Sequence, residues 1–466
     1  MAGLADEVRA TPAHPRRDFH ALPATRSRGR LAFLLPLPLA AVVGLAAGAA
    51  PQPALVVTAA VVSALVLVSR VEWAALAVIC SAVFEAYLSL VSPWATEWLF
   101  GVLLVAWLVR RAQGPLHQHR LVALAVLVGG LVGALVVAFL AHPLGAAGLA
   151  VCATYVELCV VMLVLADVLC GQLAPRRAAR LYVLACVAAS VCGILTAIVS
   201  DRHRVAGPVE SSDTLAFFLV AAIPLVGTVR SRVEQPAWWV RACFAILIVA
   251  VVGSQSRAAF VALVGMLLIA VLTGVLALRY AGALIAIITT GVALLIAVLP
   301  LRIGEALSDP QRYSDTNIAQ RNDVRLAAFE MTRASPVVGL GPAAYSLFHQ
   351  DYRDPGTPAQ DRDIDTAYST LLEASAELGV LGVVALYALW AVPAAAARRR
   401  WLKERSHLTA ATLLAIDGLL TASLLGSVQY VLPLWFLAAM AFALGRPSRP
   451  RIPLLGDNSS GQVVAR

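Results

Sequence analysis

The sequence predicts an all-α polytopic membrane protein, and three observations lead to that prediction. Of the 466 residues, 60% are hydrophobic and only 14% are charged, whereas soluble domains are closer to half apolar and a quarter charged. Apolar runs of about twenty residues recur along the chain, and each is long enough to cross a bilayer as a helix. These runs are solid, whereas the strands of a membrane barrel would alternate between apolar and polar residues.

Polar segments divide the chain into tails, membrane bundles and one large loop. Residues 1–30 form a basic tail, which we expect to be disordered and which lacks the cleavage site of a signal peptide. We expect about fourteen spans, or about twelve if the shortest runs do not cross. The expected spans cover residues 31–50, 53–69, 73–92, 95–109, 121–141, 148–170, 181–199, 212–229, 238–253, 258–278, 281–300, 374–396, 408–426 and 428–445. The expected regions are thus the tail, a transmembrane bundle (31–300), a large loop (301–371), C-terminal transmembrane helices (372–445) and a second tail (446–466).

Basic residues indicate which side of the membrane each loop occupies, because cytoplasmic loops are rich in arginine and lysine. Arginine clusters occur in every second loop, for example at 110–120 and 398–405, while most of the loops between them are nearly uncharged. The net charge of +9 is therefore spread over membrane loops and does not form a patch for nucleic acid. We expect both termini in the cytoplasm and the 301–371 loop on the extracytoplasmic side.

The large loop, of about seventy residues, is too long and too polar for a simple connection, and loops of this size are usually functional or disordered. A short helix is predicted from Asp315 or Asn317 to about Thr332, because either residue is a suitable cap. The Ser335-Pro336 step must end it, since the residue before a proline disfavours helical geometry.

The same loop contains a pair of arginines followed by a pair of glycines. Arg321 and Arg325 are one helical turn apart and share a face of the predicted helix. Gly339 and Gly341 follow the helix and permit a tight turn with close backbone approach. This arrangement predicts a helix that lies on the membrane surface and presents two guanidinium groups to a phosphate.

Several arginines lie on the extracytoplasmic side, where membrane orientation does not require them. They include Arg204, Arg257, Arg321, Arg325 and Arg333. Any one of them is also explained by contact with a lipid phosphate or by an ion pair within a loop. As a group they favour an outward-facing site for an anion, because arginine binds phosphate with two parallel hydrogen bonds.

Acidic residues at the end of the loop are candidates for proton transfer. Glu373 and Glu377 lie one turn apart at the start of the next span, and Asp365 precedes them. The simpler explanation is that the helix dipole favours acids in the first turn, with Asp365 as a cap. The functional alternative is that one of these acids, or Tyr368, takes the proton of a substrate hydroxyl.

No cofactor is predicted. The seven cysteines all lie in or at the ends of apolar runs, where we expect them to be packing residues. The sequence has no cysteine–histidine cluster of the kind that binds a metal and no glycine motif of the kind that binds a nucleotide.

Four stretches between residues 200 and 382 match the landmarks of one family in their order and spacing. They are Arg204 to Ala216, Ser254 to Ala259 with Arg257 inside it, Arg321 through Ser335-Pro336 and Gly339-Leu340-Gly341 to Tyr345, and Tyr368 to Gly382 with Glu373 and Glu377 inside it. Together they resemble the O-antigen ligase and polymerase family of bacterial envelope enzymes.

The resemblance implies a transmembrane glycosyltransferase of the GT-C-like class, in the inner or plasma membrane of a bacterium. Such enzymes serve polysaccharide biosynthesis, and they pass a glycan from a polyprenyl-pyrophosphate carrier to an acceptor hydroxyl on a glycan, lipid or protein. They use neither metal nor nucleotide. The residues that the resemblance assigns to catalysis are Arg257, Arg321, Asp365 and Tyr368. Those that it assigns to binding the pyrophosphate or glycan are Arg204, Arg325, Gly339, Gly341 and Glu377.

The chain departs from the family pattern at two places. Asp213 stands where asparagine is usual, and Tyr368 stands where many members have a histidine. A tyrosine has an ordinary pKa near 10 and is a weak base at neutral pH, so Asp365, His349 or a glutamate would take that role, or the acceptor differs. An inactive scaffold of the same fold is one alternative. A secondary transporter is another, although the chain shows no clear internal repeat.

Overall fold

The computed structural model of the chain describes residues 64, 67–92, 94–112, 121–200, 204–209, 211–229, 237–275, 282, 310–353 and 366–446. For residues 91, 237 and 310–320 only the backbone is described. Both expected tails lie outside these residues almost entirely, as do the expected spans 31–50 and 281–300. Within the described parts, all regular secondary structure is helical.

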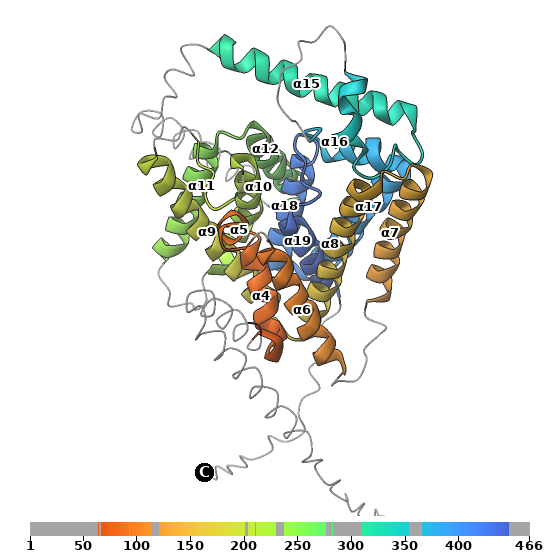
Figure 1. Cartoon of the computed structure of the whole chain (residues 1–466). Helices are drawn as coiled ribbons and strands as arrows, with labels where there is room; N and C mark the ends of the chain where they lie inside the picture. Colours follow the sequence, from red (N-terminus) through yellow and green to blue (C-terminus); the bar gives the residue numbers. More distant parts are fainter. Residues whose placement is uncertain are drawn as a thin grey trace, which may run out of the picture. The chain divides into compact units, whose positions relative to one another are not determined.

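The helices follow the apolar runs of the sequence in order (Figure 1). Their bounds are α4 Val71–Ser81, α5 Glu85–Val91, α6 Ala95–Ala112, α7 Val122–Ala141, α8 Gly145–Gly171, α9 Pro175–Val199, α10 Ser212–Ala222, η2 Ile223–Val229, α11 Ala237–Ser254, α12 Arg257–Leu272, α15 Pro310–Ala334, α16 Ala344–Phe348, η3 His349–Tyr352, α17 Thr370–Glu404, α18 His407–Ala422 and α19 Leu432–Leu444.

Five elements within the described residues are long and apolar enough to cross a membrane. They are α7, α8, α9, the continuous α10–η2 run and α17. Shorter apolar helices accompany them, namely α4, α11, α12, α18 and α19. These helices support the prediction of an all-helical, membrane-embedded protein, while the full count of about fourteen spans stays a prediction.

The expected span 73–92 is two helices with a break between them. α4 ends at Ser81 and α5 begins at Glu85. The N–H of Ala86 donates to the carbonyl of Pro208 at 3.0 Å, which joins the broken region to the 204–209 segment. The prediction of one continuous helix is therefore wrong here, because a contact distant in the sequence stabilises the break.

α19 lies at the centre of the bundle. Every residue from Leu432 to Ala441 is buried, which is typical of a helix that is apolar on all sides and enclosed by others. It packs against α8, α17 and α18. At its start the indole of Trp435 donates to the carbonyl of Gln429 at 2.8 Å and meets the ring of Trp390 on α17 edge-on.

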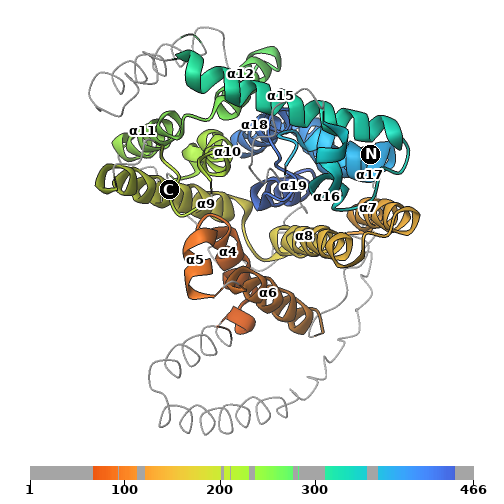
Figure 2. The same cartoon turned by 45° about the horizontal axis from the view of Figure 1, so that its top comes forward.

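α15 lies across one end of the bundle, from the α12 side to the α16 and α17 side (Figure 2). It begins at Pro310, so the prediction of a start at Asp315 or Asn317 is wrong; a proline is well suited to a first helical position. Its end at Ala334, directly before the Ser335-Pro336 step, agrees with the prediction. Its apolar face is fully buried at Val324, Ala327, Ala328 and Met331. The helix therefore packs on α17 through that face and leaves the other face for polar residues.

α17 is not a simple span, because its backbone is broken at Gly379 (φ 63°, ψ −167°). The turn after α15 fills the break: Leu340 N–H donates to Ala376 at 2.9 Å, Gly341 N–H to Glu377 at 3.0 Å, and Val380 N–H to Pro336 at 2.9 Å. A Cβ on Gly339 would lie 2.3 Å from the backbone of Glu377, and a Cβ on Gly379 would lie 2.3 Å from that of Val337. The two glycines thus let two backbones interlock.

Candidate functional site

Two predicted arginines meet on one carboxylate. The Oδ1 of Asp213 lies 3.5 Å from a terminal guanidinium nitrogen of Arg204, and its Oδ2 lies 3.3 Å from one of Arg321. The three side chains come from the 204–209 segment, the first turn of α10 and the middle of α15. They are between 24% and 44% exposed, so the cluster is open to solvent on one side.

Local structure holds Arg204 and Asp213 in place. The Ser211 hydroxyl caps α10 by accepting from the Thr214 N–H at 3.0 Å, which sets Asp213 in the first turn of the helix. Arg204 donates from Nε to the carbonyl of Ser254 at 3.0 Å and from a terminal nitrogen to that of Gln255 at 3.3 Å. Gln255 has φ 54°, a left-handed conformation that turns its carbonyl toward the arginine.

Tyr368 joins the same cluster from the segment before α17. The guanidinium of Arg321 lies over its ring at 4.5 Å from the centroid, a cation–π contact. Arg325 donates to the carbonyl of Tyr368 at 3.0 Å and to that of Leu425 at 3.4 Å. Tyr368 has φ 49°, so its backbone turns sharply as the chain enters α17. Arg325 therefore fixes the backbone under the ring, and the ring orients Arg321.

Arg325 differs from Arg321 in its partners, which are backbone carbonyls and not a carboxylate. Burial, and to a smaller extent the neighbouring charge of Arg321, lower the pKa of its guanidinium. Its Nε is buried and has no hydrogen-bond partner among the described residues. We therefore expect Arg325 to stabilise the structure of the site.

Arg257 begins α12, two residues beyond the Gln255 carbonyl that accepts from Arg204. The hydroxyl of Ser256 caps the helix by accepting from Ala259 N–H at 3.4 Å. The Arg257 side chain is exposed, and no ion pair joins it to another described residue. The bond from Arg204 to Gln255 thus brings the start of α12 close to Arg204 in space, and the exposed Arg257 is available to an outside ligand.

Gly339, Gly341 and Glu377 form a second group, which is structural in its contacts. Glu377 is 4% exposed and its Oε1 accepts from the N–H of Tyr345 at 3.3 Å. Gly341 (φ 101°) approaches the carbonyl of His142, where a Cβ would lie 2.5 Å away. The prediction that these residues bind substrate is not tested by their placement, but their contacts show that they join the α15 turn to α17.

Glu373, which the sequence offered as a candidate for proton transfer, is an anchor in its contacts. It is 4% exposed, and its oxygens accept three hydrogen bonds. The donors are the N–H of Ala367 at 3.1 Å, the hydroxyl of Ser427 at 2.6 Å and the amide of Gln429 at 2.5 Å. These bonds tie the segment that contains Tyr368 to the loop before α19, so Glu373 positions Tyr368 from below.

Replacing Glu373 with alanine is expected to lower the free energy of unfolding by about 3 kcal/mol or more, because three donors, two of them buried, would lose their acceptor. Thermal unfolding of the purified protein in detergent measures the change. Glu404→Ala is the matched control: this exposed acid lies at the far end of α17 and pairs with Arg400, and surface ion pairs contribute about 0–1 kcal/mol. Equal effects of both changes would contradict the anchoring role.

Other predicted participants lie elsewhere. Asp365 is outside the described residues. His349 is buried, with Nδ1 3.0 Å from the carbonyl of Tyr345 and its ring stacked on the Tyr345 ring. Burial raises the pKa of the Tyr345 hydroxyl, which donates to the Val324 carbonyl at 3.1 Å. Neither His349 nor Tyr345 is therefore placed to take a proton at the arginine cluster.

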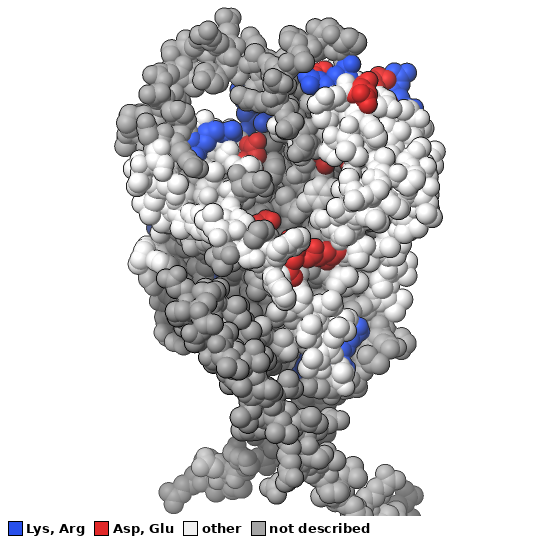
Figure 3. Space-filling model, viewed as in Figure 1, with Lys and Arg blue, Asp and Glu red and all other residues white. Residues whose placement is uncertain are grey.

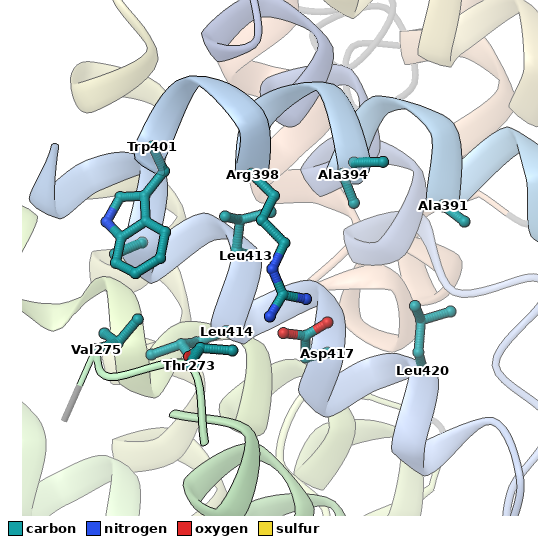
Figure 4. A pocket seen from close by; sticks show the side chains of 12 residues that line it. Thr273, Val275, Ala391, Ala394, Arg398, Trp401, Leu413, Leu414, Asp417 and Leu420 are labelled. Carbon is teal, nitrogen blue, oxygen red and sulfur yellow. The ribbon is translucent and has the colours of Figure 1, made fainter. Parts of the chain in front are cut away.

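Asp417, an acid within the apolar helix α18, faces a different space. It lines a cavity of about 200 Å³ between α17 and α18, where it points toward Arg398 (Figure 4). Asp167, another such acid, accepts from the indole of Trp107 at 2.8 Å. Both acids thus have local partners away from the arginine cluster.

The distribution of charge on the surface is consistent with an anion-binding site next to a membrane. On the face in Figure 3, basic side chains lie mainly toward the α15 end, while acidic side chains lie both there and lower on a largely uncharged surface. Among the described residues, no group of three or more histidine, cysteine or acidic side chains is placed to hold a metal ion. What the arrangement offers is a set of guanidinium groups at the end of an apolar bundle, which is suited to a phosphate-bearing lipid.

Comparison with known proteins identifies a family to which part of the chain is similar. Residues 242–387 match the family described as O-antigen ligase, and no curated protein matches the chain. The matched stretch contains Arg257, Arg321, Arg325 and Tyr368, while Arg204 and Asp213 precede it. Residues 242–387 of this membrane-embedded chain are therefore similar to the O-antigen ligase family of glycosyl-transfer enzymes, in agreement with the resemblance seen in its motifs.

Proposed function

We propose that this protein transfers a glycan from a polyprenyl-pyrophosphate carrier to an acceptor hydroxyl at the outer face of a bacterial inner or plasma membrane. The acceptor is a glycan in a polymerase and another lipid or protein molecule in a ligase. The proposal also places both termini in the cytoplasm and the 301–371 loop, with α15, on the extracytoplasmic side.

One observation supports the proposal above the others: Arg204, Arg321 and Tyr368 converge from three separate segments at the end of an apolar bundle. A lipid-linked pyrophosphate needs guanidinium groups for its charge and apolar walls for its tail. The exposed Arg257 starts α12 beside this cluster and adds a further cation that a ligand can reach.

The reaction breaks the bond between the sugar C1 and the pyrophosphate oxygen, and forms a bond between C1 and the acceptor oxygen. Negative charge develops on the pyrophosphate as it leaves with its prenyl chain. Fixed cations stabilise such charge in the transition state more than in the ground state, as the donors of an oxyanion hole do. In this scheme Arg204, Arg257 and Arg321 act on the leaving group.

The acceptor hydroxyl loses its proton in the same reaction. Tyr368 is next to the arginine cluster and Asp365 is three residues before it in the chain, so we assign the acceptor end to this segment. The Glu373 anchor and the Arg325 bond to the Tyr368 carbonyl keep the segment in place. A fixed position matters because misplacement by about 1 Å can lower a rate a hundredfold.

A transfer assay in membranes tests the proposal with a short glycan on polyprenyl pyrophosphate and native extract as the source of acceptors. We expect free carrier pyrophosphate and glycan on a new acceptor. Arg257→Ala is expected to lower the rate by about a hundredfold, the lower end of the range for the loss of one stabilising donor. The matched control is Arg333→Ala, which removes an arginine of the same loop that pairs only with the exposed Glu330 among described residues.

Two outcomes would count against the proposal. Intact carrier with the wild-type protein would favour the inactive scaffold or the transporter. An equal loss in Arg257→Ala and Arg333→Ala would mean that general surface charge, and not a defined site, governs the rate.

A further inference from the structure

The proposed donor site already contains an anion of the protein itself. Asp213 places one carboxylate oxygen against Arg204 and the other against Arg321. A carboxylate and a phosphate present oxygens to guanidinium groups in similar geometry. The positions that a pyrophosphate would occupy on these two arginines are therefore taken by Asp213.

We propose that Asp213 is a built-in competitor: it holds Arg204 and Arg321 in place between turnovers, and the pyrophosphate of the donor displaces it. This inference rests on the proposed function, because it assumes that these arginines bind pyrophosphate. Under this inference, the affinity for the donor depends on the exchange of the Asp213 carboxylate for pyrophosphate on the guanidinium groups of Arg204 and Arg321.

The geometry suits an exchange. Both contacts, at 3.5 and 3.3 Å, are longer than the 2.7–2.9 Å typical of strong charge-assisted hydrogen bonds. The Asp213 side chain is 26% exposed, so it can turn to water without disrupting packed neighbours. Pyrophosphate has more charge and more oxygens than a carboxylate, so it is the stronger partner for two arginines.

Each group also keeps a partner after the exchange. Asp213 lies in the first turn of α10, where the helix dipole and free N–H groups favour a negative charge. Arg204 remains bonded to the Ser254 and Gln255 carbonyls, and the Arg321 guanidinium remains over the Tyr368 ring. The arginines are thus held for the incoming anion even when Asp213 moves away.

The test measures binding of inorganic pyrophosphate to the purified full chain in lipid nanodiscs by calorimetry. Asp213→Asn keeps the shape of the side chain and removes its charge. If Asp213 occupies the site about nine-tenths of the time, removing the competitor tightens the apparent Kd about tenfold. Asp213→Ser, a second neutral residue suited to a first turn, is expected to do the same. Glu330→Gln removes an exposed acid from α15 and is expected to leave the Kd unchanged.

The outcomes separate this inference from the function on which it rests. Unchanged or weaker binding by both Asp213 variants, together with weaker binding by Arg321→Ala, would overturn the competitor and leave the pyrophosphate site intact. Unchanged binding by Arg321→Ala would instead remove the arginine site, and the proposed function would fail with it. Tightening by Glu330→Gln equal to that by Asp213→Asn would reduce the effect to net surface charge, which also overturns the competitor.

Discussion

Replacing Arg321 with alanine is expected to lower the rate of glycan transfer by about two to three orders of magnitude, the cost of losing one preorganised donor to a developing oxyanion. Arg321 is the residue on which the cluster depends most, because it contacts both the Asp213 carboxylate and the Tyr368 ring. The transfer assay in membranes measures the change, with donor concentration varied so that kcat and KM are obtained separately.

Arg321→Lys separates geometry from charge. A lysine retains the positive charge, but it lacks the planar fork that meets two oxygens and lies flat on a ring. We expect Arg321→Lys to recover only part of the lost kcat. Full recovery would mean that Arg321 contributes charge alone, and an unchanged rate in Arg321→Ala would exclude it from the reaction.

The membrane class and the identity of α15 were predictable from local sequence. Apolar runs of sufficient length predict spans wherever they occur. The spacing of Val324, Ala328 and Met331 along one side of α15 predicts its buried face, and all three are fully buried. These features depend on helical periodicity, which a single sequence contains.

The arrangement of the site was less predictable, because it depends on contacts between distant segments. The sequence suggested Arg204 and Arg321 as partners of one anion, but nothing local to either residue indicated that Asp213 bridges them. Glu373 looked like an ordinary acid of a first helical turn. Its three donors come from the preceding segment and from the loop before α19. No local sequence pattern predicts that these two segments come into contact at Glu373.

The break in α17 has the same origin. A glycine inside an apolar run is compatible with an intact helix, and Gly379 gave no local sign of a break. The α15 turn decides the outcome, because its backbone occupies the space beside Gly379 and donates to carbonyls that a regular helix would use. The break is thus a property of two segments together.

Gly339→Ala and Gly379→Ala are each expected to destabilise the protein strongly, with a loss in the free energy of unfolding of about 4 kcal/mol. Two causes add. Both glycines have positive φ, at 70° and 63°, which costs an alanine about 1–2 kcal/mol. Each new Cβ would also lie 2.3 Å from the backbone of the other segment, and a backbone cannot yield as a flexible side chain can. The yield of monodisperse protein and its thermal midpoint in detergent measure the effect.

Gly130→Ala is the matched control. Gly130 lies in α7 with no atom within 4 Å of an added Cβ, and a helical glycine replaced by alanine gains about 0.5–1 kcal/mol. The double variant Gly339→Ala, Gly379→Ala gives the sharper test. If the two glycines belong to the same contact between the α15 turn and α17, the first substitution already separates these segments. The second substitution then lowers the free energy of unfolding by little more than the cost of its own backbone strain. Changes at coupled sites are non-additive in this way, whereas full additivity would show that the two glycines act independently.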